Sequence, residues 1–432
     1  MLLAPYAAST LQLETRALLT RIDRLQPFAL VMPMVAAARV SSEASDAIER
    51  YLLEGRRTLR ARVLEYLHWL RRRDHAARPD EAQRRFAFLK LRFNVVLTHF
   101  DIFANALTVR GEIGNGVWLA GLDATAEDAL TLDAEYYQLP PVVTYLDRGH
   151  GAAIRRARTR LPGGGANPVA IIRVPRERMV GSGIASSLVH EAGHQGAALL
   201  DLLPSLRAEL RARERASAGP ERLAWRLWER WISEIAADFW SVAKLGVAAT
   251  QGLMGVVSLP RAFVFRVQFD DPHPFPWIRV KLSAAMGRML HPDPQWALLD
   301  QLWEAFYPRT GLDASRLALI EALERSIPAF IELLASHRPA ALRGASLGRA
   351  FDLPSRRPSR LRALFRISRG GPEALLSLPP TLALAVLGQA KQDRRLTPER
   401  ESRVVAELLT RIGLRRALEG ARAAPPVRVA AA

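Results

Sequence analysis

The chain has 432 residues, of which 49% are hydrophobic and 24% are charged, so it can build the cores of two or three domains and is not disordered in composition. It contains no cysteine, which excludes a disulfide framework, a thiolate zinc finger and a cysteine nucleophile, and leaves nitrogen and oxygen atoms as ligands for any metal ion. The formal net charge of +18 would attract nucleic acid, anionic membranes or acidic partners. Because no nucleic-acid-binding motif accompanies this charge, we do not expect nucleic acid to be the partner.

We expect a soluble, cytoplasmic protein. A chain without cysteine fits a reducing cytoplasm, and the first residues, MLLAPYAASTLQLETRALL, lack the basic start, apolar core and cleavage site of a secretory signal. The charge-free stretch 245–260 has 16 residues, fewer than the roughly 20 that a membrane-spanning helix needs. Contact of the basic surface with anionic lipid stays open.

Residues 1–110 are expected to form a helical N-terminal region. Between Ser45 and Arg73, apolar residues recur at intervals of three and four, and arginines occupy the opposite face. A second helical segment runs from Asp80 to about Thr108. No residue of this region carries visible chemistry, so the sequence indicates a packing or docking role.

Residues 111–180 differ in character. The segments 140–147 and 167–175 are short, rich in β-branched residues and bounded by proline or glycine, which predicts two strands. The sequence LPGGGANP between them predicts a flexible loop. Candidates in this region for polarising a substrate carbonyl are Tyr136, Tyr137 and Tyr145.

Helices are expected again at 183–203, where Pro204 ends the first of them, and at about 221–245. The last segment, 338–432, holds 19 Lys+Arg against 7 Asp+Glu and therefore carries +12 of the net charge. A helix in this segment is well marked, with Thr397 as its cap, a proline at its first position and Gly420 at its end.

Two histidines lie four residues apart in the first of these helices, in the sequence His190-Glu191-Ala192-Gly193-His194. Residues four apart share one helical face, so both imidazoles can point at one metal ion. Glu191 is rotated by about 100 degrees, which suits it to act as a general base on a metal-bound water rather than as a ligand. Gly193 would weaken a free helix by about 1 kcal/mol, so we expect it to let a neighbouring backbone approach. The HExxH pattern is typical of zincin peptidases.

A catalytic zinc site needs a third protein ligand. The metzincin arrangement is excluded, because Ala197 and Leu200 stand where its glycine and third histidine would be. Further along, the sequence EIAAD places Glu234 and Asp238 four apart on one face of an otherwise apolar helix. Since isolated carboxylates are costly to bury, a metal ligand and an acceptor for an imidazole N–H would explain the pair, and a solvent-exposed stripe is the alternative.

HExxH followed by ExxAD resembles the gluzincin peptidases, and the closest pattern is that of the heat-shock and CAAX-processing zinc proteases. In that family an HPxxxxR[IV] element follows the glutamate helix, and residues 273–280, HPFPWIRV, fit it. The resemblance covers about residues 180–285, roughly a quarter of the chain. The membrane-spanning helices typical of that family are not evident here, so its substrate and membrane location are not carried over.

The resemblance implies a role for each matching residue. His190, His194 and Glu234 would be the zinc ligands. Glu191 would be the general base, and Asp238 would accept a hydrogen bond from a ligand histidine and so orient it. His273 and Arg279 would lie near the cleft, where one of them could stabilise the oxyanion formed when water attacks a carbonyl. Alternatively, Arg279 pairs with Asp270 or Asp271, and His273 only fixes the proline-rich loop.

The expected fold is α+β and mostly α, with a zincin-like core of a small sheet and an active-site helix, flanked by helical regions. We expect a helical N-terminal region at 1–110, a zincin-like metallopeptidase domain at 111–337 and a basic helical region at 338–432. Zincins place a strand edge above the active-site helix, where an extended peptide can add to it, and 167–175 is the candidate for that strand.

The expected function is zinc-dependent hydrolysis of a peptide or protein substrate, with Glu191 taking a proton from water and returning it to the leaving amine. Two other interpretations stay open. One is a non-catalytic, zinc-containing helical scaffold or binding protein, in which the helical regions dock a protein partner. The other is a nucleic-acid-associated protein that uses the basic C-terminal region, whose binding would fall steeply with salt.

Overall fold

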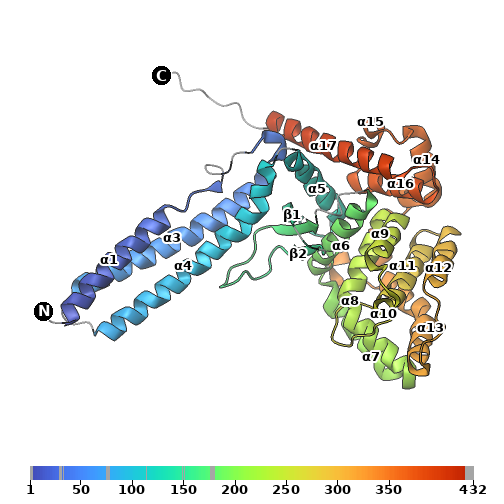
Figure 1. The fold of residues 1–432 in the computed structure, drawn as a ribbon, viewed down its shortest axis with the longest axis horizontal. Helices are drawn as coiled ribbons and strands as arrows, with labels where there is room; N and C mark the ends of the chain where they lie inside the picture. Colours follow the sequence, from blue (N-terminus) through green and yellow to red (C-terminus); the bar gives the residue numbers. More distant parts are fainter. Residues whose placement is uncertain are drawn as a thin grey trace.

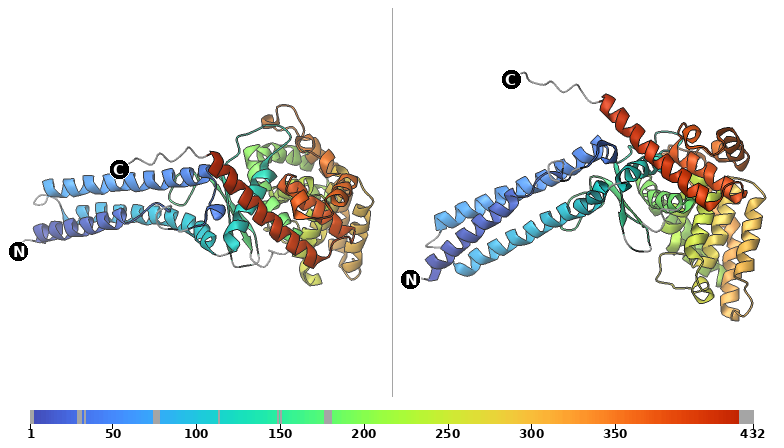
Figure 2. Two further views of the ribbon diagram at one scale, coloured as in Figure 1. Left: turned by 90° about the horizontal axis from the view of Figure 1, so that it is seen from above. Right: turned by 45° about the horizontal axis from the view of Figure 1, so that its top comes forward.

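A three-helix arm projects from a helical body, and a small sheet lies where the two meet (Figure 1, Figure 2). This computed structural model describes residues 3–28, 32, 34–73, 78–112, 114–147, 149, 151–175 and 181–423. Within these ranges the chain is mostly helical and has one three-stranded sheet, which confirms the predicted α+β, mostly α class. Nowhere in the described ranges does a helix combine the length and apolar character needed to cross a lipid bilayer.

The arm consists of α1 (Leu3–Asp23), α3 (Ser42–Arg73) and α4 (Pro79–Thr108). The apolar stripes predicted for this region face one another, and their far end is closed by a cluster that includes Leu18 and Val63. A second cluster, which includes Phe103, Val143 and Ile171, joins the near end of the arm to the sheet. The arm is therefore packed against the body at one end and extends into solvent at the other (Figure 1).

The sheet contains β1 (Val142–Asp147), β2 (Ala153–Arg155) and β3 (Ala170–Pro175) in the spatial order β1-β3-β2. Strand β3 pairs in parallel with β1 and antiparallel with β2. The strands predicted at 140–147 and 167–175 are present, but β3 lies in the middle of the sheet. The prediction that 167–175 offers a free edge is therefore wrong, because both of its edges are paired. The edge strand on that side is β2.

Helix α5 (Asn115–Leu130) has no counterpart among the predicted elements. It is covered by α6, α17 and β1, so its apolar residues surround the helix and leave no amphipathic stripe to mark it. Gly121 allows α17 to cross closely, since a Cβ there would lie 2.3 Å from the carbonyl oxygen of Leu409. The C-terminal helix α17 thereby packs directly on α5, along the upper side of the body in Figure 1.

Four helices follow the sheet: α6 (Ser182–Leu199), α7 (Leu202–Ala216), α8 (Gly219–Leu245) and α9 (Val247–Val257). The helix predicted for 183–203 ends earlier than expected. A turn with Asp201 at φ 47° separates α6 from α7, and Pro204 lies in the first turn of α7. Proline is tolerated there because the first-turn N–H has no partner within the helix, so Pro204 marks a start and not an end.

The rest of the body consists of further α-helices and short 3-10 turns. The α-helices are α10 (Arg261–Val264), α11 (Pro276–Leu290), α12 (Gln295–Phe306), α13 (Ala314–Ser336), α14 (Pro358–Ser368), α15 (Pro372–Leu375), α16 (Pro380–Gln392) and α17 (Pro398–Ala423). The 3-10 turns are η1 (Ala36–Ala38), η2 (Val109–Gly111), η4 (Ala340–Leu342), η5 (Leu347–Ala350) and η6 (Pro354–Arg356). Helices from α5 to α17 share one hydrophobic core, which surrounds the buried C-terminal half of α8.

Candidate metal centre

Helices α6 and α8 pack against each other with little space between their backbones. A Cβ at Gly193 would lie 2.9 Å from the Cα of Ala237, and a Cβ at Gly196 would lie 2.4 Å from the ring of Trp240. These two glycines therefore permit the close approach that the sequence predicts at Gly193. The close packing brings the histidine face of α6 against the carboxylate face of α8.

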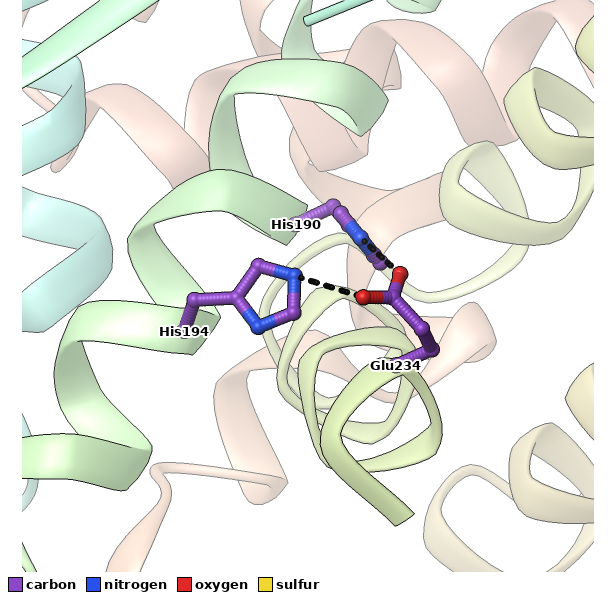
Figure 3. Close-up of side chains that lie close together, drawn as sticks. All are labelled: His190, His194 and Glu234. Carbon is purple, nitrogen blue, oxygen red and sulfur yellow. Dashed lines mark hydrogen bonds and ion pairs between the residues drawn. The ribbon is translucent and has the colours of Figure 1, made fainter. Parts of the chain in front are cut away.

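Three predicted ligands converge at this contact (Figure 3). His190, His194 and Glu234 each offer one ligand atom, and these atoms all lie within 4.8 Å of one another. The Nε2 atom of His190 is 3.2 Å from one carboxylate oxygen of Glu234, and the Nε2 atom of His194 is 3.4 Å from the other. Both imidazoles thus present the same ring nitrogen to one carboxylate, from two turns of a single helix.

Asp238 lies behind His190, one helical turn beyond Glu234. Its Oδ1 atom is 2.8 Å from Nδ1 of His190, and a hydrogen bond from Nδ1–H to this oxygen would leave the Nε2 lone pair available to a metal ion. Both Glu234 and Asp238 are buried, which excludes the alternative of a solvent-exposed acidic stripe. The predicted role of Asp238, orienting a histidine from behind, matches this position.

Arg279 and His273 complete the charge balance around the carboxylates. Arg279 donates to both oxygens of Asp238, with Nε at 2.6 Å from Oδ2 and Nη2 at 2.9 Å from Oδ1. It therefore pairs with Asp238, and not with Asp270 or Asp271. His273 stands in the loop before α11, with Nε2 3.2 Å from Glu234 and Nδ1 2.8 Å from Asp271. His273 thus makes both contacts: it fixes the loop through Asp271 and reaches the metal centre through Glu234.

The carboxylates of the centre are held in their ionised form. Burial disfavours charge on the ring of His190, yet its hydrogen bonds with Asp238 and Glu234 raise its pKa to about 9. Burial would raise the pKa of Glu234, but the facing histidines hold it far below its ordinary value. In the same way, Arg279 and His190 outweigh burial and lower the pKa of Asp238 to about 2. Glu234 and Asp238 are therefore ionised although they are buried, with the histidines and Arg279 as their counter-charges.

Glu191 follows His190 along α6 and lines the same cavity. Its side chain is buried, and this burial raises the pKa of the carboxyl above its ordinary value. Within the described part of the chain, no side chain donates a hydrogen bond to it. A carboxylate in this position can accept a proton from a water molecule held beside the three ligands.

The centre opens into a cavity of about 640 Å³. Its walls are formed by α6 and α8, by the segment 151–156 around β2, by α9, by the first two turns of α7, and by α11 with the loop before it. Of the predicted site residues, the cavity contains His190, Glu191, His194, Glu234, Asp238, His273 and Arg279. The three tyrosines proposed for carbonyl polarisation are not in its lining, and Tyr137 instead donates a hydrogen bond of 2.5 Å to the carbonyl of Leu130.

Several lining residues have no motif that could reveal them in the sequence. Ser233 stands next to Glu234, and its hydroxyl is 3.5 Å from Nδ1 of His194. Arg156 follows β2, and Arg207 is one of many arginines on α7. Only the approach of distant segments places these side chains in the cavity.

The residues present fit a divalent metal ion. Two imidazoles and one carboxylate are the ligand types that a catalytic zinc site uses, and an outer carboxylate orients one imidazole as such sites require. Comparisons with protein-family models, with curated proteins and with solved structures give no match to this chain. The assignment of a function therefore rests on the chemistry and geometry of the site itself.

Proposed function

We propose that the chain is a zinc-dependent hydrolase of peptide bonds. The observation that supports this most directly is the convergence of His190, His194 and Glu234, whose ligand atoms lie within 4.8 Å of one another. Glu191 stands beside them on the wall of a cavity large enough to admit part of a peptide. The resemblance of the three motifs to gluzincin peptidases agrees with this proposal.

In the proposed reaction the residues of the chain act in turn on one water molecule and one peptide. A zinc ion on the three ligands would lower the pKa of water and polarise the substrate carbonyl. Glu191 takes the proton of the attacking water and passes it to the leaving amine. The raised pKa of the Glu191 carboxyl suits this exchange, since a stronger base accepts the proton more readily.

His273 is the better candidate for stabilising the oxyanion. The guanidinium of Arg279 is committed to Asp238, and its side chain is only 12% exposed. The ring nitrogens of His273 also face carboxylates, those of Glu234 and Asp271, but its side chain is 50% exposed and lines the cavity from the loop before α11. We therefore assign Arg279 to positioning Asp238 and Glu234, and His273 to contact with the substrate.

The substrate would lie in extended form along β2. This strand pairs with β3 on one side, and residues 151–156 border the cavity. Free backbone groups at a strand edge can pair with an added peptide strand. Since the sequence has no cysteine, we propose a reducing compartment such as the cytoplasm as the setting.

The alternative of a non-catalytic zinc scaffold has less support at this site. A structural zinc site is closed by four protein ligands, whereas the cluster found in the described residues offers three. A scaffold also has no use for a buried carboxylate at Glu191, which costs free energy to hold there. The arm nevertheless provides a long helical surface on which a protein partner could dock (Figure 2).

The test replaces the base and one ligand separately. Glu191→Gln should retain zinc, because the ligands stay. Its rate of hydrolysis of a peptide library should fall about 100-fold or more, because the proton acceptor is removed. His194→Ala should lose zinc as well. Metal content is measured by elemental analysis and cleavage by mass spectrometry. Glu65→Gln, an exposed change on the arm, is the matched control and should keep both properties.

The base assignment is wrong if Glu191→Gln cleaves as fast as the unaltered protein. The ligand assignment is wrong if His194→Ala keeps its full zinc content. Cleavage that survives complete removal of metal by a chelator would contradict the proposed reaction as a whole.

A further inference from the structure

The cavity has an apolar end beside the N-terminal half of α6. There the side chain of Ser186 packs against α9, since a Cβ on Gly252 would lie 2.3 Å from the Cβ of Ser186. From α9, the side chains of Ala249, Leu253 and Val256 complete this part of the lining. An apolar side chain placed at this end would leave water for apolar surroundings, which is favourable.

The opposite end, beside the C-terminal half of α6, is cationic. The backbone N–H of Ala157 donates to the side chain of Gln195 at 2.8 Å, which fixes the segment after β2 next to His194. Arg156 precedes this contact and lines the cavity. Helix α7 begins where α6 ends, and from it Arg207 lines the same end.

Within the described part of the chain, carboxylates do not fully balance the positive charges of these two arginines. Glu229 lies 3.7 Å from Arg207, but it is shared with Arg211, which is closer at 2.9 Å. The Nε atom of Arg207 is the atom that faces Glu229, and at 3.7 Å it makes no hydrogen bond to that carboxylate. No carboxylate of the described residues pairs with Arg156. A guanidinium presents a planar set of donors that matches a carboxylate, so the pair can receive an anionic group.

We propose that this cavity selects peptides by a carboxylate at the α7 end and an apolar side chain at the α9 end. The carboxylate is that of an aspartate or glutamate on one side of the scissile bond, or that of a free C-terminus. Arg156 and Arg207 are the specificity-determining residues. The selectivity rests on the proposed function, because it describes substrates of the same centre.

The experiment measures binding apart from hydrolysis. Zinc-loaded Glu191→Gln protein is titrated with fluorescently labelled peptide pools, and affinity is read by anisotropy. One pool carries Asp and Glu and a C-terminal amide, a second carries Asn and Gln with the amide, and a third carries Asn and Gln with a free C-terminus. All three contain the same apolar residues, so the acidic side chain and the terminal carboxylate are tested separately.

We expect at least one carboxylate-bearing pool to bind about tenfold more tightly than the neutral amidated pool, as charge-assisted hydrogen bonds to a guanidinium allow. The double variant Arg156→Gln/Arg207→Gln, made in the Glu191→Gln background, should remove this preference and retain zinc. Arg215→Gln, an exposed change on α7 outside the cavity, is the matched control and should keep it.

The proposal is overturned if the pools bind equally, if none of them binds, or if the double variant keeps the preference. The unaltered protein is tested for hydrolysis of the same pools. Preferential binding without any hydrolysis would contradict the proposed function and leave carboxylate recognition standing, whereas hydrolysis without preference would contradict the selectivity alone.

Discussion

Asp238 connects the two halves of the centre, because its carboxylate meets both His190 and Arg279. Replacing it by asparagine keeps the shape but removes the charge that favours the Nδ1–H form of His190. We expect Asp238→Asn to lower zinc affinity about 10- to 100-fold, the usual effect of losing the outer partner of a ligand histidine. Competition with a chromogenic chelator measures this. Asp46→Asn on the exposed face of α3 is the control, and equal affinities in the two variants would contradict the role given to Asp238.

His291 is a second residue whose environment sets its chemistry, and it lies away from the metal centre. It is fully buried, with Nε2 3.1 Å from the carbonyl oxygen of Val242 and Nδ1 without a partner among the described residues. Burial lowers the pKa of His291 from 6.5 to about 4. The unfolded chain therefore takes up a proton near pH 6.5, whereas the folded chain resists protonation until about pH 4.

The stability that neutral His291 contributes is thus complete above about pH 6.5 and is lost as the pH falls toward 4. The shift corresponds to about 3 kcal/mol of unfolding free energy over this range. His291→Gln keeps an N–H donor but cannot titrate. As the pH falls between these values, its unfolding free energy should therefore decrease by about 3 kcal/mol less than that of the unaltered protein. Urea unfolding at both pH values measures this. His68→Gln, at an exposed position, should behave as the unaltered protein. The prediction is contradicted if the unfolding free energy of His291→Gln falls with pH as much as that of His68→Gln.

At this scale, residues with a motif are predictable and residues without one are not. The sequence identifies two pairs, His190 with His194 and Glu234 with Asp238, because a spacing of four places each pair on one helical face. Nothing local distinguishes Arg156 or Arg207 from the other arginines, since their roles arise only when β2 and α7 meet beside α6.

Among the elements, the α6–α8 contact decides whether the three ligands can meet. Gly193→Ala would place a Cβ 2.9 Å from Ala237 and from Trp240, so the helices must separate. We expect a loss of about 1–3 kcal/mol of unfolding free energy, as for other overpacked cores, together with weaker zinc binding. Thermal unfolding and metal titration measure the two effects.

Gly183→Ala is the matched control in the same helix, because nothing lies within 4 Å of a Cβ there. That change should leave zinc binding unaltered and slightly stabilise α6, since alanine favours a helix over glycine. If Gly193→Ala binds zinc as tightly as Gly183→Ala, the close helix contact is not what positions the ligands.

Elements that the sequence failed to indicate share a physical cause. Helix α5 has no exposed residue, so burial does not separate an apolar face from a polar one, and the periodic pattern that identifies a helix is absent. Strand β2 has only three residues, too few for an alternating pattern. By contrast, α3, α4 and α8 have long stretches with one apolar face, and their predicted ranges agree closely with the structure.

For the whole molecule, the charge count of residues 338–432 overstates the positive charge that this region offers to a partner. In the C-terminal region, Arg356 is buried and donates to the carbonyl oxygen of Lys244 at 2.9 Å. Arg362 pairs with Asp293 at 2.7 Å and with Asp393 at 3.0 Å, while Arg416 pairs with Glu127 at 2.7 Å. These arginines hold the region to the body. Part of the +12 of residues 338–432 is therefore balanced by carboxylates of the body and is not free to bind nucleic acid.

The arm and the body have separate hydrophobic clusters at their far ends, which allows their stabilities to be uncoupled. Leu18 is fully buried in the arm between α1, α3 and α4. Leu18→Ala should remove about 2–5 kcal/mol of packing free energy there and raise hydrogen exchange in these three helices, while exchange in α6 and α8 and the zinc content stay the same. Mass spectrometry of exchanged peptides measures this. Leu13→Ala, on the same helix at a position that is 62% exposed, should change neither the stability of the arm nor its hydrogen exchange. Faster exchange in α6 and α8 would show instead that arm and body unfold as one unit, so that events at the arm reach the metal centre.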